Sequence, residues 1–195
     1  MFPEERIDTY VREILEENGE GAHTYDHTRR VLGICIEIGN SMGANLRILG
    51  AAALLHDVGR PFEKQLGKSH SVISGEIGRE FLATCDYSDQ EIESVVDAIR
   101  THRFSEGIPP DSLEGRILSD ADKLDAIGAI GIFRGIAQAA VSGRGIQGFL
   151  DHADEKLLRL RDLLYTEVAM RMAQERHLIL DSFVKQLRRE ATSKV

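Results

Sequence analysis

Residues 45–61 have the sequence NLRILGAAALLHDVGRP, in which an apolar helical stripe runs directly into a histidine and an aspartate. Apolar residues recur at helical spacing through its first ten positions. Asn45 is typical of a helix N-cap, and Pro61 ends the segment because proline cannot donate a backbone hydrogen bond. His56 and Asp57 are therefore predicted to lie at the C-terminus of a helix, among apolar residues.

The same helical periodicity extends along nearly the whole sequence, whereas the alternating patterns typical of β-strands are scarce. We therefore predict an all-α fold, a bundle of about seven or eight helices. Three predicted helices cover 3–17, 45–57 and 71–85, and three more begin after Tyr25, at the Ser88–Glu91 capping box and at Ser112. Two further helices are predicted within 151–189, and the first of these carries Leu157, Leu160, Leu164 and Val168. Glycines at 128, 131 and 135 argue against one continuous helix from Ser112.

Composition and charge exclude several classes of function. The chain has 195 residues, 42% hydrophobic and 29% charged, and no stretch rich in Pro, Gly and Ser divides it, so a single domain over 1–195 is expected. A net charge of −8 argues against binding of polymeric nucleic acid, which depends mainly on Lys and Arg. The apolar runs are too short to span a bilayer, and the start lacks the plan of a signal peptide. We therefore expect a cytoplasmic protein without membrane association.

Histidines and aspartates gather on the predicted helices at positions where burial is costly. The positions are His27 within a helix, His56 and Asp57 at a helix end, His70 after a loop, His102 on an inner face, and Asp120, Asp122 and Asp125 in the segment SDADKLD. A buried carboxylate needs a compensating cation, and three neighbouring carboxylates repel one another. A divalent metal ion satisfies both requirements. Mixed His and carboxylate ligands suit Mn, Fe, Co, Ni or Zn better than Ca or Mg alone.

Helix spacing distinguishes the three aspartates of this segment. Asp122 lies four residues after Leu118, and Asp125 directly follows Leu124, so both are expected to face inward. Asp120 is expected to point in roughly the opposite direction to Asp122. Asp122 is therefore the better metal ligand, and Asp125 is the better candidate to orient a ligand His or a metal-bound water.

Three motifs resemble those of the HD-domain superfamily of metal-dependent phosphohydrolases, whose pattern is a lone His, then His-Asp, then a downstream Asp. The matching motifs are YDHTRRV around His27, AALLHDVGR around His56 and Asp57, and DADKLDAIG around Asp122. The run 115–134 and the segment 152–160 are similar to a subgroup of small, single-domain HD phosphohydrolases that includes bacterial nucleotide hydrolases. The resemblance covers nearly the entire chain.

The resemblance implies a helical bundle whose metal-binding core covers about residues 23–125. In this core, one divalent ion would be held by His27, His56, Asp57 and Asp122. Some members of the family bind a second ion, and Mg is among the metals that they use. The resemblance also implies that metal-activated water cleaves a phosphoester or phosphoanhydride bond of a small phosphorylated metabolite such as a nucleotide. On the same ground, Asp57 could bridge to a second metal or accept a proton from the attacking water.

Other residues have less certain assignments. Related two-metal proteins supply two extra histidines where His70 and His102 fall, so these two could bind a second metal, contact substrate phosphate or serve the fold alone. His23, one helical turn before His27, could reach the mouth of the site or cap the chain. Substrate phosphate could be bound by Arg30, Arg60, Lys64, Lys123 and Lys156, of which Lys123 and Lys156 lie within the motifs. The C-terminal leucine stripes belong to the core or to a dimer surface, which leaves a homodimer open.

Two other functions compete with hydrolysis. Some proteins with the HD fold use two irons and four histidines to activate oxygen, and His27, His56, His70 and His102 would permit a di-iron oxygenase. The third alternative is a non-catalytic nucleotide-binding sensor that retains the fold. The intact set of four metal residues argues against such a sensor, because a degenerate site would be expected to lose a ligand.

Overall fold

Helices account for all the regular secondary structure in the described part of the chain. The computed structural model describes residues 3–18, 24–103 and 106–192, and these contain ten α-helices, the 3-10 helices η1 and η3, and no strand. The all-α prediction is confirmed. Packing divides the chain into two compact units, Met1–Ala121 and Asp122–Val195. The single-domain expectation stays a prediction, and each unit is described by itself.

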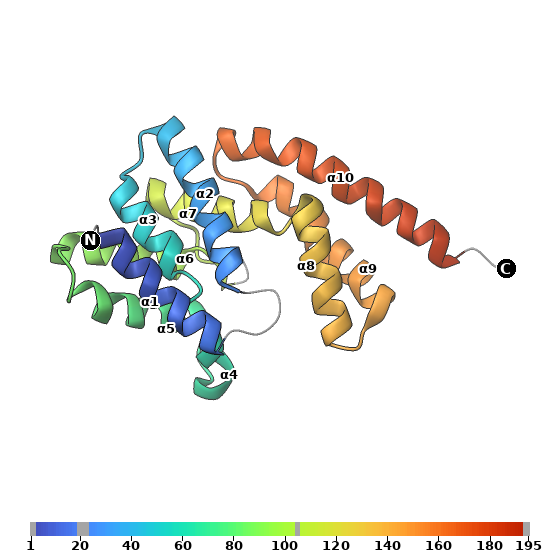
Figure 1. The fold of residues 1–195 in the computed structure, drawn as a ribbon. Helices are drawn as coiled ribbons and strands as arrows, with labels where there is room; N and C mark the ends of the chain where they lie inside the picture. Colours follow the sequence, from blue (N-terminus) through green and yellow to red (C-terminus); the bar gives the residue numbers. More distant parts are fainter. Residues whose placement is uncertain (1–2, 19–23, 104–105, 193–195) are drawn as a thin grey trace. The chain divides into compact units, whose positions relative to one another are not determined.

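The first unit is organised around α3 (Leu46–Leu55), which packs against α1, α2 and α6 (Figure 1). Its other helices are α1 (Pro3–Asn18), α2 (Tyr25–Met42), the 3-10 helix η1 (Arg60–Phe62), α4 (Glu63–Leu66), α5 (His70–Leu82), α6 (Asp89–Thr101) and α7 (Leu113–Asp125), which continues past the unit boundary. Every residue from Leu49 to Leu55 is buried, as expected for a helix that is apolar on all sides. The central position of α3 places its C-terminal His-Asp pair inside this unit.

Two helix starts follow the predicted capping chemistry. The Asn45 side chain accepts hydrogen bonds from the backbone N–H groups of Arg47 (3.1 Å) and Ile48 (3.4 Å) at the start of α3. Ser88 and Glu91 form a capping box at the start of α6. Such side chains satisfy first-turn N–H groups that have no partner within the helix. Both predicted helix starts are confirmed.

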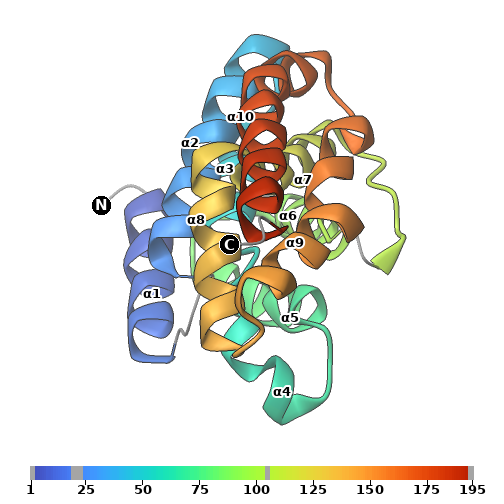
Figure 2. The same ribbon diagram turned by 90° about the vertical axis from the view of Figure 1, so that its right-hand side faces the viewer.

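The second unit contains α10 (Glu167–Thr192), with α8 (Gly128–Val141), α9 (Gly145–Glu155) and the 3-10 helix η3 (Leu157–Leu163) packed beside it (Figure 2). The prediction of an α-helix that carries Leu157 through Val168 is wrong, because this stretch is η3 and Val168 belongs to α10. Leu157 and Leu160 are both buried, and their spacing of three residues suits the three-residue turn of a 3-10 helix.

The stretch from Ser112 is broken between Asp125 and Gly128, as its glycines indicated. Gly128 has a φ of 74°, a left-handed conformation that side chains other than glycine rarely adopt. No single described helix has the length and apolar composition to cross a membrane, although α7 and α8 taken together as a bent pair do.

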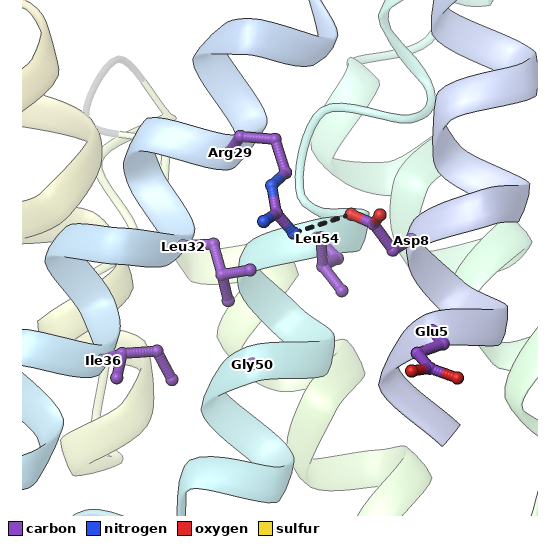
Figure 3. Close-up of a pocket in the computed structure, with 7 residues that line it drawn as sticks. All are labelled: Glu5, Asp8, Arg29, Leu32, Ile36, Gly50 and Leu54. Carbon is purple, nitrogen blue, oxygen red and sulfur yellow. Dashed lines mark hydrogen bonds and ion pairs between the residues drawn. The ribbon is translucent and has the colours of Figure 1, made fainter. Parts of the chain in front are cut away.

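A cavity of about 260 Å³ lies among α1, α2 and α3 in the first unit (Figure 3). Its walls are Glu5, Asp8, Arg29, Leu32, Ile36, Gly50 and Leu54. Asp8 and Arg29 form an ion pair at 3.1 Å across it, and Asp8 also accepts a hydrogen bond from the Tyr25 hydroxyl at 2.6 Å. No histidine within the described ranges lines it, so this cavity does not coincide with the predicted metal residues that the structure describes.

Candidate metal centre

His56 follows the last residue of α3, and its ring is fixed by the end of that helix. The last carbonyl groups of a helix have no partner within the helix. The Nδ1–H of His56 donates to one of them, the carbonyl oxygen of Ala53, at 2.8 Å. The neutral ring therefore carries its proton on Nδ1, and its Nε2 presents a lone pair to the interior of the first unit.

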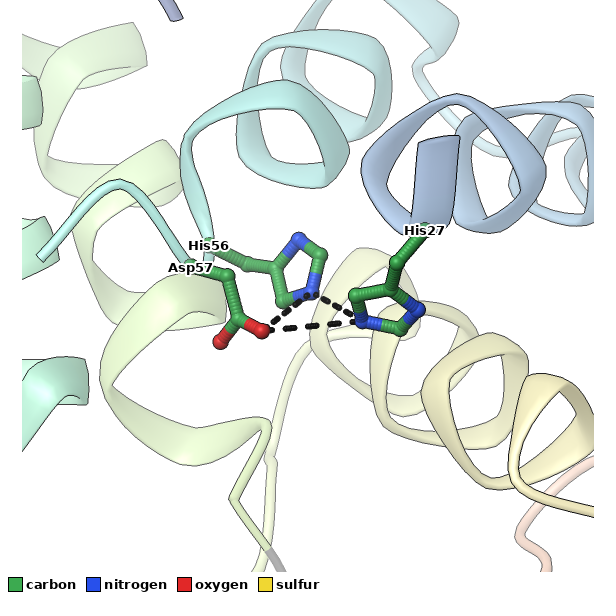
Figure 4. Close-up of side chains that lie close together, drawn as sticks. All are labelled: His27, His56 and Asp57. Atoms are coloured by element: carbon green, nitrogen blue, oxygen red, sulfur yellow. Dashed lines mark hydrogen bonds and ion pairs between the residues drawn. The ribbon is translucent and has the colours of Figure 1, made fainter. Parts of the chain in front are cut away.

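His27, His56 and Asp57 form a first cluster, in which all three side chains are buried (Figure 4). The Nε2 atoms of the two histidines lie 3.3 Å apart, and they lie 3.6 Å and 3.7 Å from Asp57 Oδ2. Two ligands that bind one ion at about 2.1 Å each are separated by about 3 to 3.5 Å. The spacing of these three atoms therefore fits a shared divalent ion.

Asp57, His70 and His102 form a second buried cluster on the other oxygen of the same carboxylate. The Nε2 atoms of His70 and His102 lie 3.3 Å and 3.9 Å from Asp57 Oδ1. His102 follows the last residue of α6, and its Nδ1–H donates to the carbonyl oxygen of Ile99 at 2.6 Å, as His56 does at the end of α3. Asp57 thus stands between two pairs of imidazole nitrogens, with one oxygen toward each pair.

The protonation of His70 suits a metal ligand. Burial lowers the pKa of His70 to about 4, although the nearby Asp57 carboxylate acts in the opposite direction. The ring is therefore neutral at neutral pH, the form that binds metal ions. Among the residues that the structure describes, its buried Nε2 has no hydrogen-bond partner. A buried polar atom without a partner is costly, and a metal ion at this position would remove that cost, so the residues present fit a divalent ion.

Three charged residues lie around Asp57 and His70, and only Arg60 among them was predicted from the sequence, as a possible phosphate-binding residue. Arg60 Nε lies 2.9 Å from Asp57 Oδ2, and Glu63 Oε1 lies 3.3 Å from His70 Nδ1. Arg103 Nη1 donates to the same Glu63 oxygen at 2.8 Å. In the sequence, Glu63 is one of several charged residues between His56 and His70, Arg103 directly follows His102, and no periodicity or motif distinguished either of them.

The segment that contains Asp122 differs from the prediction. Asp120 is fully buried and Asp122 is half-buried, so the expectation that Asp120 points away from the core is wrong. Residues 117–121 are all buried, so this part of α7 is covered on all sides. The prediction assumed that only one face of the helix is buried, and it therefore does not apply here. Asp122 lies in the second unit, and its role as a fourth ligand stays a prediction.

The remaining predicted residues fall in both units. Asp125 is buried and its Oδ2 accepts a hydrogen bond from Arg134 at 2.6 Å, which fixes the carboxylate. Lys123 is buried with its Nζ 4.7 Å from the centre of the Tyr165 ring. Among the other substrate-binding candidates, Arg30 is half-buried on α2, Lys156 is exposed after α9, and His23 lies outside the described residues. Their roles, and that of Asp125 in catalysis, stay predictions.

A family comparison covers the region that holds both clusters. The HD domain model matches residues 24–127, which include His27, His56, Asp57, His70 and His102. The chain belongs to the HD domain family. The resemblance predicted from the sequence is confirmed.

Relatives of this HD domain chain match along nearly its whole length. The uncharacterized protein YpgQ of Bacillus subtilis is 34% identical over 95% of this chain and 92% of its own length. The crystal structure of YpgQ in complex with ADP superposes with a TM-score of 0.80 at 30% identity, over 97% of this chain and 98% of that one. A predicted HD superfamily hydrolase from an uncultured Thermotogales bacterium has a TM-score of 0.72 at 32% identity, over 96% of this chain and 92% of its own.

Proposed function

We propose that this HD domain protein is a metal-dependent phosphohydrolase that cleaves a phosphoester or phosphoanhydride bond of a small phosphorylated metabolite, and that this metabolite is a nucleotide. The observation that carries the proposal is the position of Asp57, whose two oxygens each face a pair of histidine Nε2 atoms at 3.3 to 3.9 Å. One carboxylate can therefore serve two adjacent ion positions, with Asp122 as the proposed further ligand of the first.

A bound divalent ion supplies a Lewis acid, which lowers the pKa of water and offsets the negative charge on phosphoryl oxygens. No nucleophilic side chain is required for such a reaction. The protein contributes a buried carboxylate that can accept a proton and two imidazoles, His56 and His102, whose Nδ1 atoms are already held by backbone carbonyl groups. These groups are held in place before substrate binds, which reduces the reorganisation that catalysis requires.

Two arginines at the edge of the clusters support an anionic substrate. The side chains of Arg60 and Arg103 are 25% and 31% exposed, so both border the buried cluster and can be reached from solvent. A guanidinium group binds phosphate through paired hydrogen bonds. The complex of the relative YpgQ with ADP supports a nucleotide as the substrate class.

The test is a hydrolysis screen with the purified protein. Mn²⁺, Co²⁺, Ni²⁺ and Mg²⁺ are each supplied with nucleoside mono-, di- and triphosphates, sugar phosphates and an aryl phosphate, and released phosphate and pyrophosphate are measured. We expect metal-dependent turnover of a nucleotide by the wild type. Asp57→Ala should abolish it, because both clusters lose their shared carboxylate, whereas Asp97→Ala, which removes an exposed carboxylate on α6, should not.

Two results would decide against the proposal. If the wild type hydrolyses nothing that Asp57→Ala fails to hydrolyse, the phosphohydrolase assignment is wrong, and binding of a nucleotide without turnover would favour a sensor. Four histidines around one carboxylate also suit a di-iron oxygenase. Bound iron with dioxygen consumption in the active protein would favour that function, and full hydrolytic activity in iron-free protein would exclude it.

A further inference from the structure

The polypeptide turns sharply after Asp57 and is pressed against the first turn of α5. Gly59 donates its N–H to Ser74 Oγ at 2.9 Å. A Cβ atom at position 59 would lie 2.6 Å from the backbone nitrogen of Ser74 and 2.8 Å from the carbonyl oxygen of His70, distances that real Cβ atoms do not show. Glycine therefore permits this close approach, which brings η1 and the start of α4 to the N-terminus of α5.

Glu63, the first residue of α4, consequently lies beside His70, the first residue of α5. One oxygen, Oε1, accepts from three donors, which are the His70 backbone N–H at 3.2 Å, the His70 Nδ1–H at 3.3 Å and Arg103 Nη1 at 2.8 Å. Burial raises the pKa of Glu63, but hydrogen bonds from His70 and the charge of Arg103 lower it overall. Glu63 is therefore a carboxylate at neutral pH.

This arrangement differs from that of His56 and His102. Those two rings donate to a carbonyl oxygen three residues earlier in their own helices, so the helix end itself orients them. His70 begins its helix and has no such carbonyl, because the free backbone groups at a helix N-terminus are N–H donors. A carboxylate from another segment takes the place of the missing acceptor.

We infer that Glu63 is a positioning residue that holds the His70 ring with its proton on Nδ1 and its Nε2 toward Asp57 Oδ1, and so sets the affinity of the second cluster for a divalent ion. The inference rests on the metal site of the proposed function. Arg103 assists, because it holds the accepting oxygen of Glu63 and also donates to Ser69 Oγ at 3.1 Å.

Arg103 is itself held by a second carboxylate. Glu106 lies 3.6 Å from Arg103 Nη1 and accepts hydrogen bonds from the hydroxyl groups of Ser69 and Ser71, the latter at 2.7 Å. Burial raises the pKa of Glu106, but these hydroxyl groups and Arg103 lower it overall, so it too is ionised. The positive charge of Arg103 thus lies between two carboxylates, which fixes its position relative to Glu63.

The first test measures ion binding directly, by calorimetric titration of metal-free protein with Mn²⁺. We expect two ions per chain in the wild type. Glu63→Gln keeps the size of the side chain but removes its charge, and it should weaken the second ion by about 10- to 100-fold while the first is unchanged, as is usual when a partner of a metal-binding histidine is lost. Glu76→Gln is the matched control, because it removes an exposed glutamate on α5 that pairs with Lys68.

The second test needs no metal. Two-bond ¹H–¹⁵N correlation spectra of the metal-free protein report which ring nitrogen of His70 carries the proton. The wild type and Glu76→Gln should show the proton on Nδ1, and Glu63→Gln should show a mixture of the two forms. A residue that merely caps α5 would change the melting temperature without changing this spectrum.

Each outcome is decisive for one proposal. The inference would be overturned if the wild type binds only one ion, or if Glu63→Gln binds the second ion with an affinity within twofold of the wild-type value. Neither result would decide whether the protein is a hydrolase. Two bound ions with the expected loss, but no turnover of any phosphorylated substrate, would support the inference and refute the proposed function. If Glu63→Gln does not fold, Arg103→Gln should shift the second ion in the same direction by a smaller factor.

Discussion

The two clusters share Asp57, but their histidines are held in different ways. In the first, His27 lies within α2 and His56 is oriented by the end of α3, so the geometry follows from two packed helices. In the second, His70 depends on Glu63, which comes from a four-residue helix and is held by Arg103, 40 residues later in the sequence. A ligand held by its own helix is fixed once that helix packs. A ligand held by another segment is fixed only when that segment is also in place.

The largest effect should come from the first cluster. His56→Ala removes a ligand that faces both His27 Nε2 and Asp57 Oδ2. We expect the affinity for the first Mn²⁺ ion to fall by at least about 100-fold, which is more than the loss expected when a residue such as Glu63 that only contacts a ligand histidine is changed. Hydrolysis should fall to the background level. Titration calorimetry and the phosphate-release assay measure the two. The control is His177→Ala, which changes a histidine that belongs to neither cluster and should bind Mn²⁺ as the wild type does. If His56→Ala binds Mn²⁺ with wild-type affinity, the first cluster is not a metal site.

His70→Ala should separate the clusters. The variant keeps His27, His56 and Asp57, so the first ion should bind with an affinity within a few-fold of the wild-type value while the second ion is lost. Hydrolysis should fall but remain above that of His56→Ala. Bound Mn²⁺ per chain, measured by elemental analysis after equilibrium dialysis, reports the difference. Loss of both ions together would show that the clusters form one indivisible site.

Gly59→Ala tests the close approach on which the second cluster depends. The added methyl group would overlap the backbone of α5, and we expect a loss of about 1–3 kcal/mol in the free energy of unfolding, together with weaker binding of the second ion. Chemical denaturation measures the stability. Gly33→Ala is the matched control, because nothing lies within 4 Å of the new methyl group on α2, and it should stabilise the protein by about 0.5–1 kcal/mol. A stable Gly59→Ala variant would contradict the packing argument.

The smallest effect should come from the capping box of α6. Ser88→Ala removes the side chain that accepts the backbone N–H of Glu91 and should cost about 1 kcal/mol of stability. His102 lies at the other end of this helix and is oriented by Ile99, so ion binding should not change. Thermal unfolding and the Mn²⁺ titration together test this expectation. A change in ion binding would mean that the second cluster is sensitive to distant helix ends as well as to Glu63.

Local sequence patterns predicted the features that depend on neighbouring residues. These features are the helix that ends just before His56, its Asn45 cap and the Ser88–Glu91 capping box, and all follow from contacts within a few positions. The same patterns gave wrong predictions at two places. At Asp120 the helix is buried on several sides, and in η3 the chain forms a 3-10 helix in place of the expected α-helix. Periodicity describes one exposed and one buried face, and neither segment has that form.

The sequence by itself determined that the protein is all-α, that it belongs to the HD domain family, and that His27, His56 and Asp57 are candidates for one metal site. Only the tertiary structure placed His70 and His102 on the second oxygen of Asp57 and brought Glu63 and Arg103 to His70. Helix formation and capping are local, whereas these contacts join residues 7 to 45 positions apart that have no shared periodicity. They form only when α5 and α6 pack around the turn at Gly59.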